Sequence, residues 1–333
     1  MTGRVIIVTG ANCGLGFMTA KLLCEGGNDV ILACRNEEKG KAAVETILKE
    51  NPNALATFLK LDLSDLSSVR TFVEEFRKLD KKLNVLISNA GIYPGKSLLR
   101  SFTKDNFELT MGTNHLGHFL LTNLLLEDLK ASAKDTGDSR IVVVTSSLHD
   151  TKVKHFNTQP LNIDDIFLSE YGSYNAAQAY KNSKLANVLF TYELARQVEG
   201  SGVTVNALCP GFIPSTELAR NSAAPMKFFT RYILGGLLRF TKITRTLEQG
   251  AKAEVDLATN DELKGVNGKY YSNLQEKKSS EESLDEELQK KFFELSARYC
   301  HLDGYEALDA PPPPTPEELK GLFFAIKFLL REL

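Results

Sequence analysis

The sequence predicts an α/β fold in which helices cover both faces of a doubly wound parallel sheet of about seven strands. Short, β-branched apolar runs alternate with helical patterns, which is the order of elements in a protein built from βαβ units. The runs are apolar throughout, as in strands that are buried on both faces. A glycine-rich turn joins the first run to the first helical pattern, which is typical of such sheets.

Each predicted strand is a run of Val, Ile, Leu or Ala that a helical pattern follows. Crossovers between parallel strands are right-handed, so six repeats of strand and helix leave few topologies other than a parallel sheet. The strands are expected at residues 5–8, 30–33, 56–61, 85–88, 141–145 and 203–208, with a seventh at 268–271.

The predicted helices carry apolar residues at three- and four-residue spacing. Asn36 and Asp65 precede two of them and are expected to be their N-cap residues. Residues 109–126 contain no charged side chain, but their many polar residues favour a buried helix over a bilayer span. The helices are expected at residues 15–25, 37–49, 66–79, 104–129 and 177–198, with a further one from Leu247.

The pattern weakens after Gly211. Residues 225–240 form an apolar, partly helical part of a lid-like insertion at about 212–246, which either packs into the core or covers a substrate pocket. The charged stretch 276–291 predicts a solvated helix face, and we place the end of a single catalytic domain, residues 1–300, just after it. Residues 301–333 are expected to be a proline spacer and an amphipathic tail helix, which either docks back or lies on a membrane surface.

Composition excludes several classes of protein. The 333 residues are 43% hydrophobic and 25% charged, unlike disordered or collagen-like chains. A net charge of −2 provides no basic excess for phosphates, so we expect no nucleic-acid partner. Five cysteines without a C-x-x-C pair, and the lack of an Asn-x-Ser/Thr site, favour a reducing compartment. We therefore expect a cytoplasmic protein, with peripheral membrane contact through 225–240 or 317–333 as an alternative.

The glycine-rich turn follows the first strand and opens the first helix, the place where Rossmann-type folds bind a dinucleotide. Its glycines permit a tight turn and let a pyrophosphate approach the backbone N–H groups of the helix N-terminus. The candidate cofactor residues here are Gly10, Asn12, Cys13, Gly14, Leu15 and Gly16.

The end of the second strand favours NADP over NAD. Arg35 stands where an acid that binds the ribose would be expected, and its guanidinium suits a 2′-phosphate. Lys39, one turn into the next helix, adds a second positive charge. Further candidates end the third and fourth strands, at the edge where an α/β sheet holds its ligand: Asp62, Leu63, Asn89, Ala90 and Gly91.

Tyr180 and Lys184 are the main catalytic candidates. At positions i and i+4 of a helix, the phenol and the ammonium lie on one face. A neighbouring cation favours the ionised phenol and is expected to lower the pKa of Tyr180, which makes it a usable acid or base. Ser146, at the end of the fifth strand, could hydrogen-bond the reacting oxygen, with Ser147 as the second choice. His115 and His118 share a helix face but lack a third ligand, so we expect no metal site.

These motifs together resemble the short-chain dehydrogenase/reductase family over residues 4–275. The sequences TGANCGLG, SNAG, YKNSK and the pair Pro210-Gly211 occur in the family's order, with Ser146 between them. The sequences around Thr113–Leu121 and Ser183–Asn187 are most similar to the branch of retinol dehydrogenases and protochlorophyllide reductase.

The resemblance implies a role for each matching residue. Tyr180 would transfer the proton and Ser146 would polarise the carbonyl. Lys184 would hold the nicotinamide ribose, and Asn114 would fix a water of a proton relay. Asp62 and Leu63 would lie at the adenine. The implied nicotinamide side comprises Asn89, Gly91, Pro210, Gly211, Ile213 and Ser215.

The family and the residues together predict an NADP(H)-dependent oxidoreductase that interconverts an alcohol and a carbonyl on a bulky apolar substrate, as retinol dehydrogenases do. The connection from Ser146 to Tyr180 is longer than in compact members of the family. The identity of the substrate is therefore the property that the resemblance predicts least well. Phe212 stands where protochlorophyllide reductase has a cysteine, which counts against a C=C reductase. A non-catalytic NADP-binding protein is the other alternative. The expected partner is a lipophilic small molecule, and the chain is a monomer or a homodimer.

Overall fold

The computed structural model describes residues 3–95, 97, 99–153, 158–169, 174–213, 245–272 and 274–312. The expected insertion core at 225–240, the tail helix at 317–333 and the candidate Ser215 lie outside these residues.

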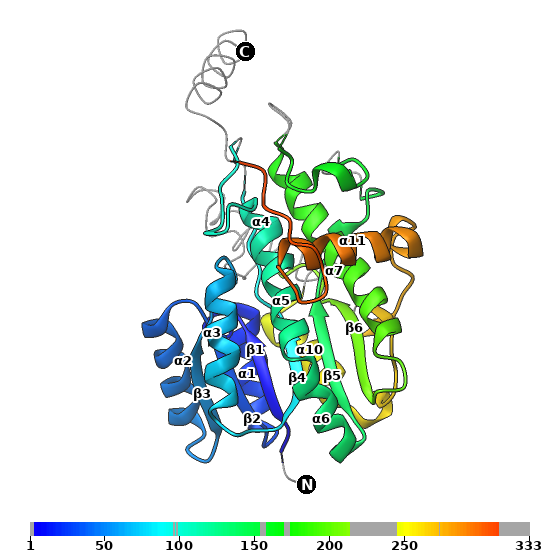
Figure 1. Ribbon diagram of the computed structural model, residues 1–333. Helices are drawn as coiled ribbons and strands as arrows, with labels where there is room; N and C mark the ends of the chain where they lie inside the picture. Colours follow the sequence, from blue (N-terminus) through cyan, green and yellow to red (C-terminus); the bar gives the residue numbers. More distant parts are fainter. Residues whose placement is uncertain are drawn as a thin grey trace.

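The described chain forms one eight-stranded sheet in the order β3-β2-β1-β4-β5-β6-β7-β8 (Figure 1). Seven strands are parallel, which confirms the predicted doubly wound sheet. The eighth strand pairs antiparallel with β7 and was not predicted, because its two residues are polar and exposed. The strands are β1 (Val5–Thr9), β2 (Asp29–Cys34), β3 (Leu55–Lys60), β4 (Leu83–Ser88), β5 (Ser139–Val144), β6 (Val203–Cys209), β7 (Lys269–Ser272) and β8 (Gln275–Glu276).

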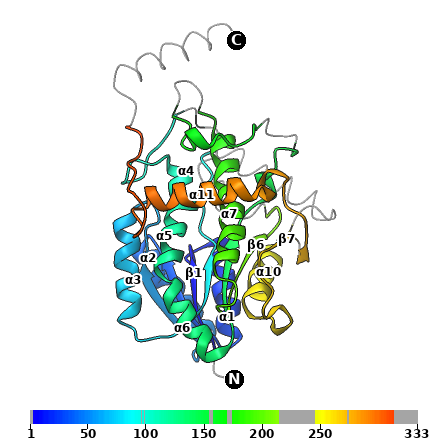
Figure 2. The ribbon, with the colours of Figure 1, turned by 45° about the vertical axis from the view of Figure 1, so that its right-hand side comes forward.

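Two helical layers bury the two faces of the sheet (Figures 1 and 2). Along β1, Ile6 and Val8 pack into one hydrophobic cluster and Ile7 into the other, so both faces of the strand are covered. This explains why the strands are apolar without alternation. One layer contains α1 (Gly14–Glu25), α2 (Glu37–Glu50) and α10 (Leu247–Thr259). The other contains α3 (Leu66–Arg77), α5 (Gly117–Leu124), α6 (Leu126–Thr136), α7 (Ala176–Gln197) and α11 (Glu286–Tyr299).

The single helix predicted at 104–129 is wrong. The chain forms the short helix α4 (Leu109–Met111), a π-helical turn at Gly112–Leu116 and then α5 and α6. The Glu108 carboxylate accepts the backbone N–H of Met111 at 2.7 Å, so helical structure begins after Glu108. The π turn inserts an extra residue at Asn114, a local change that apolar spacing does not reveal.

The two predicted N-caps are confirmed. Asn36 accepts the backbone N–H of Lys39 at 2.8 Å, and Asp65 accepts those of Ser67 and Ser68. These bonds satisfy N–H groups that a helix leaves without partners in its first turn. The cap at Asn36 also sets the direction in which the chain leaves β2, and hence the place of Arg35.

The charged stretch 276–291 forms more than the predicted solvated face. It includes the end of β8, a turn in which Ser279, Ser280 and Ser283 are buried, and the first turns of α11, which lies across α7 (Figure 2). Phe293 of α11 packs against Phe119 and Phe190 of the sheet-covering helices, and Phe292 packs against His115. The C-terminal part of the domain therefore packs directly behind the helix that carries Tyr180.

Candidate active site

The carboxyl ends of the parallel strands bring the predicted site residues to one edge of the sheet. Thr9 ends β1, and the glycine turn follows it. Asn89 comes directly after β4, Ser146 lies two residues after β5, and Pro210 follows β6. This is the edge where an open α/β sheet binds its ligand.

The glycine turn packs tightly against the end of β4. A Cβ on Gly16 would lie 2.4 Å from Asn89 Nδ2 and 2.6 Å from the Gly10 oxygen, so a larger residue would displace the turn. Gly10 itself has a φ of 68°, which favours glycine. Asn89 Nδ2 donates to the Thr9 oxygen at 2.7 Å. The predicted residues of this turn are therefore held together before any ligand binds.

The N-terminus of α1 suits an anion. Its first turn contains no acidic residue, and its N-cap residue Cys13 makes no side-chain capping bond to it. The backbone N–H groups there face the crevice edge with the positive end of the helix dipole. Asn12 and Leu15 are half-buried beside them, and Leu15 packs with Ile213 around Gly250 of α10.

Arg35 and Lys39 lie exposed beside this turn. The Gly10 N–H donates to the Ala33 oxygen at 2.7 Å, which joins the glycine turn to the end of β2. No acidic side chain in the described part of the chain forms an ion pair with Arg35 or Lys39. Both cations are thus available to an anionic group at the end of β2.

Asp62 and Leu63 follow β3, next to the end of β2. The Leu61 N–H donates to the Cys34 oxygen at 3.1 Å, which holds the two strand ends together. Asp62 Oδ1 accepts from the backbone N–H and the hydroxyl of Ser64, at 3.0 Å and 2.6 Å. Asp62 therefore shapes the turn, while Leu63 is buried beneath it.

Tyr180 lies at the centre of the catalytic candidates. Its side chain is 5% exposed, and the nearby Ser146 hydroxyl favours the ionised form of its phenol by lowering the pKa of Tyr180. The ring of Tyr93 meets the Tyr180 ring edge-on, with centroids 5.1 Å apart and an angle of 89°. The exposed Ser147 side chain takes no part in this contact, so the structure places the first of the two candidate serines at the phenol.

Lys184 lies behind Tyr180 and is held by the end of β5. Its Nζ atom donates to the Val144 oxygen at 3.1 Å and lies 5.8 Å from the Tyr180 ring centroid. A Cβ on Gly91 would lie 3.5 Å from Nζ and from Asn114 Oδ1, so the ends of β4 and β5 meet here. Burial lowers the pKa of Lys184 to about 8.

Asn114 links the helix with the π turn to α7 and to the end of β4. Its Oδ1 accepts the Ile92 N–H at 2.8 Å, and its Nδ2 donates to the Ile92 oxygen and the Ser183 hydroxyl, each at 3.0 Å. The π turn supplies the orientation that reaches both partners. Asn114 thereby fixes the backbone just after Gly91.

The expected effect of Lys184 on the pKa of Tyr180 is not what the structure shows. Burial raises the pKa of Tyr180 and outweighs the Ser146 hydrogen bond, which lowers it. Lys184 Nζ donates to the Val144 oxygen, and Lys184 is not among the groups that lower the pKa of Tyr180. The neutral phenol is therefore the stable form, and Ser146 is the group that favours its ionisation.

The remaining predicted residues lie after β6. Pro210 and Gly211 are half-buried, and Gly211 has a φ of 89°. Ile213 is buried against Gly250, and the neighbouring Phe212 is 47% exposed. This segment follows β6, which lies on the other side of β1 from β2 in the sheet.

A comparison with protein-family models identifies the chain. The short chain dehydrogenase model matches residues 4–158 and 168–227, which include every described candidate above. The chain belongs to the short-chain dehydrogenase/reductase family. Its relatives include human retinol dehydrogenase 13, 40% identical over 93% of this chain and 88% of the relative, and human retinol dehydrogenase 11, 40% identical over 91% and 87%.

Solved structures agree with the fold of this short-chain dehydrogenase/reductase. Levodione reductase matches 82% of the chain and 96% of that structure, with a TM-score of 0.64 and 22% identity. An actinorhodin polyketide ketoreductase solved with NADPH matches 81% and 95%, with a TM-score of 0.62 and 20% identity. Membership of the family makes the chain an oxidoreductase that interconverts alcohols and carbonyls.

The residues of this dehydrogenase/reductase fit a nicotinamide dinucleotide. A Cβ on Gly14 would meet no atom within 4 Å, so the turn is open to a ligand at this point, and the α1 N-terminus attracts a pyrophosphate. Arg35 and Lys39 offer positive charge at the next strand end. Lys184 and Tyr180 converge at the other end of the edge.

Two contacts of the candidate site were missed by the sequence reasoning. His118 Nδ1 donates to the Asn114 oxygen at 3.1 Å, and its Nε2 lies 2.9 Å from the Thr9 hydroxyl. The i and i+4 spacing of Asn114 and His118 is the signal that could have predicted the bond between them. Tyr93 was also missed, although its place two residues after Gly91 puts it at the catalytic edge.

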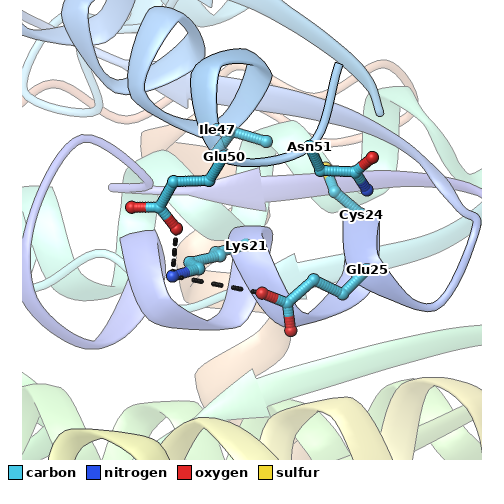
Figure 3. Close-up of a pocket in the computed structure, with 6 residues that line it drawn as sticks. All are labelled: Lys21, Cys24, Glu25, Ile47, Glu50 and Asn51. Carbon is cyan, nitrogen blue, oxygen red and sulfur yellow. Dashed lines mark ion pairs between the residues drawn. The ribbon is translucent and has the colours of Figure 1, made fainter. Parts of the chain in front are cut away.

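Two hollows lie away from the edge of the sheet that carries the candidate site. A cavity of about 240 Å³ lies between the C-terminal parts of α1 and α2, where Lys21 pairs with Glu25 and Glu50 (Figure 3). Exposed ion pairs of this kind contribute little to stability. A groove of about 750 Å³ follows α7, β7 and α11. Within the described residues, no group of three or more His, Cys, Asp or Glu could hold a metal, and no helix could cross a membrane.

Proposed function

We propose that this short-chain dehydrogenase/reductase uses NADP(H) and reduces or forms a carbonyl on a bulky apolar substrate of the retinoid type. The observation that supports the proposal is the buried Tyr180 phenol, which lies beside Ser146 and 5.8 Å, at its ring centroid, from Lys184 Nζ. These are the groups that a carbonyl oxygen needs when it gains or loses a proton.

Tyr180 and Ser146 have different roles at the carbonyl oxygen of the substrate. Bound nicotinamide dinucleotide supplies or accepts the hydride at the substrate carbon. Tyr180 donates the proton to the carbonyl oxygen during reduction, and burial keeps its phenol protonated for this step. Ser146 donates its single hydroxyl hydrogen bond to the same oxygen. In the direction of oxidation, the same groups act in reverse.

Arg35 and Lys39 support NADP as the cofactor. Both are exposed at the end of β2 beside the glycine turn, and within the described residues neither has an acidic partner. A guanidinium can bind a 2′-phosphate through two hydrogen bonds, which a ribose hydroxyl does not offer.

The substrate class rests on the relatives and on the apolar wall of the site. The relatives named above are retinol dehydrogenases by name. In this chain, Tyr93 lines the Tyr180 ring and Phe212 exposes its side chain after β6. Aromatic groups of this kind suit a long apolar molecule.

A substrate panel tests the proposal. Retinaldehyde, a steroid ketone and short aliphatic aldehydes are offered with NADPH or NADH, and product is measured. We expect retinaldehyde with NADPH to give the highest kcat/KM, and Tyr180→Phe to lower kcat about 1,000-fold while the Kd for NADPH stays within about twofold. Equal turnover by Tyr180→Phe would remove this phenol from the mechanism.

A further inference from the structure

The turn that carries Ser146 is held from behind by the buried ring of His149. This ring is 2% exposed. Its Nδ1 atom lies 2.7 Å from the Ser146 backbone oxygen, and its Nε2 atom lies 3.0 Å from the Ser280 backbone nitrogen. His149 therefore joins the catalytic turn to a segment 131 positions away in the sequence.

The two backbone partners determine the protonation state of the ring. The Ser146 carbonyl oxygen can only accept, so Nδ1 carries the proton. The Ser280 N–H can only donate, so Nε2 is the acceptor. The neutral Nδ1–H ring is the one form that makes both hydrogen bonds. Burial lowers the pKa of His149, which keeps the ring neutral.

Ser280 belongs to a buried serine turn, residues 279–283. The Ser283 hydroxyl is fully buried and lies 2.7 Å from both the Ser279 hydroxyl and the Ser280 oxygen. Gln289 of α11 donates to the Ser283 oxygen at 2.7 Å. The serine turn is therefore fixed by its own side chains and by α11, independently of the catalytic edge.

A sulfur contact holds the same catalytic turn from β6. The Ser147 N–H donates to Cys209 Sγ at 3.2 Å, and the Tyr270 hydroxyl hydrogen-bonds the same sulfur. The Tyr270 ring packs against the His149 ring, with centroids 5.2 Å apart. His149 thus lies in a packed polar network with little freedom to shift alone.

We propose that His149 is a positioning residue for the reaction. Through its two hydrogen bonds, His149 couples the position of the serine turn to the position of Ser146. The residue whose carbonyl it holds is the one whose hydroxyl meets the Tyr180 phenol. The family model ends at residue 227, so the serine turn supports the catalytic centre from outside the matched region. A shift of about 1 Å in a catalytic group costs up to about 100-fold in rate.

The groups that face His149 shape its response to pH. Asp150 follows it in the chain, Tyr270 packs on it from β7, and Lys181 of α7 pairs with Glu282 at 2.9 Å nearby. Protonation would turn Nε2 into a donor facing the Ser280 N–H, and that bond would be lost. We expect kcat to fall in acid, below the ordinary histidine pKa of 6.5.

Ser283→Ala tests the inference without a change at His149 or Ser146. We expect kcat to fall about tenfold, with KM and the Kd for NADPH within about twofold. Ser296→Ala is the matched control, because Ser296 is also fully buried and bonds a histidine, His115, at 2.9 Å. It should keep kcat. In a His149→Phe background, Ser283→Ala should have no further effect, and the acid limb should disappear.

The kinetic measurements rest on the proposed function. A second measurement is therefore chosen that needs no substrate. Amide hydrogen exchange of residues 145–150 should be faster in Ser283→Ala than in Ser296→Ala or the unchanged protein. Equal exchange in the two serine variants would overturn the inference, as would a tenfold loss that persists in the His149→Phe background. A protein that reduces no carbonyl would contradict the proposed function alone, since the exchange comparison still decides the role of His149.

Discussion

Lys184 Nζ donates a hydrogen bond to the Val144 backbone oxygen at 3.1 Å, across the end of β5. The ammonium is therefore held at the carbonyl of Val144, which is two positions before Ser146 in the chain. Burial lowers the pKa of Lys184 to about 8. Its charge is therefore available at neutral pH and lost in mild alkali. Lys184 does not lower the pKa of Tyr180, because burial of the phenol is the dominant influence.

We expect kcat for carbonyl reduction to fall as the pH rises through about 8, because Lys184 loses its proton there. The Tyr180 phenol stays neutral over this range, since burial raises its pKa. A pH profile of kcat measures the limb. Lys184→Met keeps the length of the side chain and should show lower kcat, by about 100-fold, without that limb. An unchanged alkaline limb in Lys184→Met would assign it to another group.

Local signals predicted most of the fold and the place of the glycine turn. The glycine turn and the caps at Asn36 and Asp65 depend on neighbours in sequence, and all three lie where they were expected. The break at Asn114 was not predicted, because it depends on contacts with Ile92 and Ser183, which are far away in the chain.

The electrostatics of the site could not be predicted for a related reason. Spacing placed Lys184 one turn from Tyr180, but burial, which sets both pKa shifts, depends on the whole fold. The bond from His149 to Ser280 spans 131 positions and leaves no periodic pattern. Such contacts follow only from the packed structure.

Arg35→Asp should reverse the cofactor preference. Replacing the guanidinium with a carboxylate removes the partner of a 2′-phosphate and supplies one for a ribose hydroxyl. We expect the Kd for NADPH to rise about 10- to 100-fold, with NADH binding more tightly. Titration calorimetry measures both constants. Lys49→Glu, an exposed charge change at the other end of α2, should leave the ratio unchanged. An unaltered ratio in Arg35→Asp would contradict the assignment.

Tyr93 should govern the use of large substrates. Its ring packs edge-on against Tyr180, a contact of about 0.5 to 1.5 kcal/mol. Tyr93→Phe keeps this contact and should change kcat/KM less than about threefold. Tyr93→Ala should lower kcat/KM for retinaldehyde about tenfold, and for a short aldehyde much less, because only the long substrate reaches the lost wall. Steady-state kinetics on both aldehydes decides the point. Equal losses on the two would indicate a general disturbance of Tyr180.

Glu254 of α10 should make the protein less stable as the pH rises from 5 to 8. This carboxyl is fully buried and accepts the Thr19 hydroxyl at 2.7 Å, and burial raises its pKa from 4.5 to about 8. Between these values the unfolded chain releases the proton and the folded chain keeps it, so stability falls by up to about 5 kcal/mol.

Glu254→Gln imitates the protonated carboxyl and should remove most of this dependence, as measured by Tm at pH 5 and pH 8. Glu248→Gln, an exposed change on the same helix, is the control and should retain it. Because the Glu254 carboxylate raises the pKa of Lys184, Glu254→Gln should also move the alkaline limb of kcat to lower pH. An equal fall in Tm from pH 5 to pH 8 in the two variants would show that other groups cause the pH dependence.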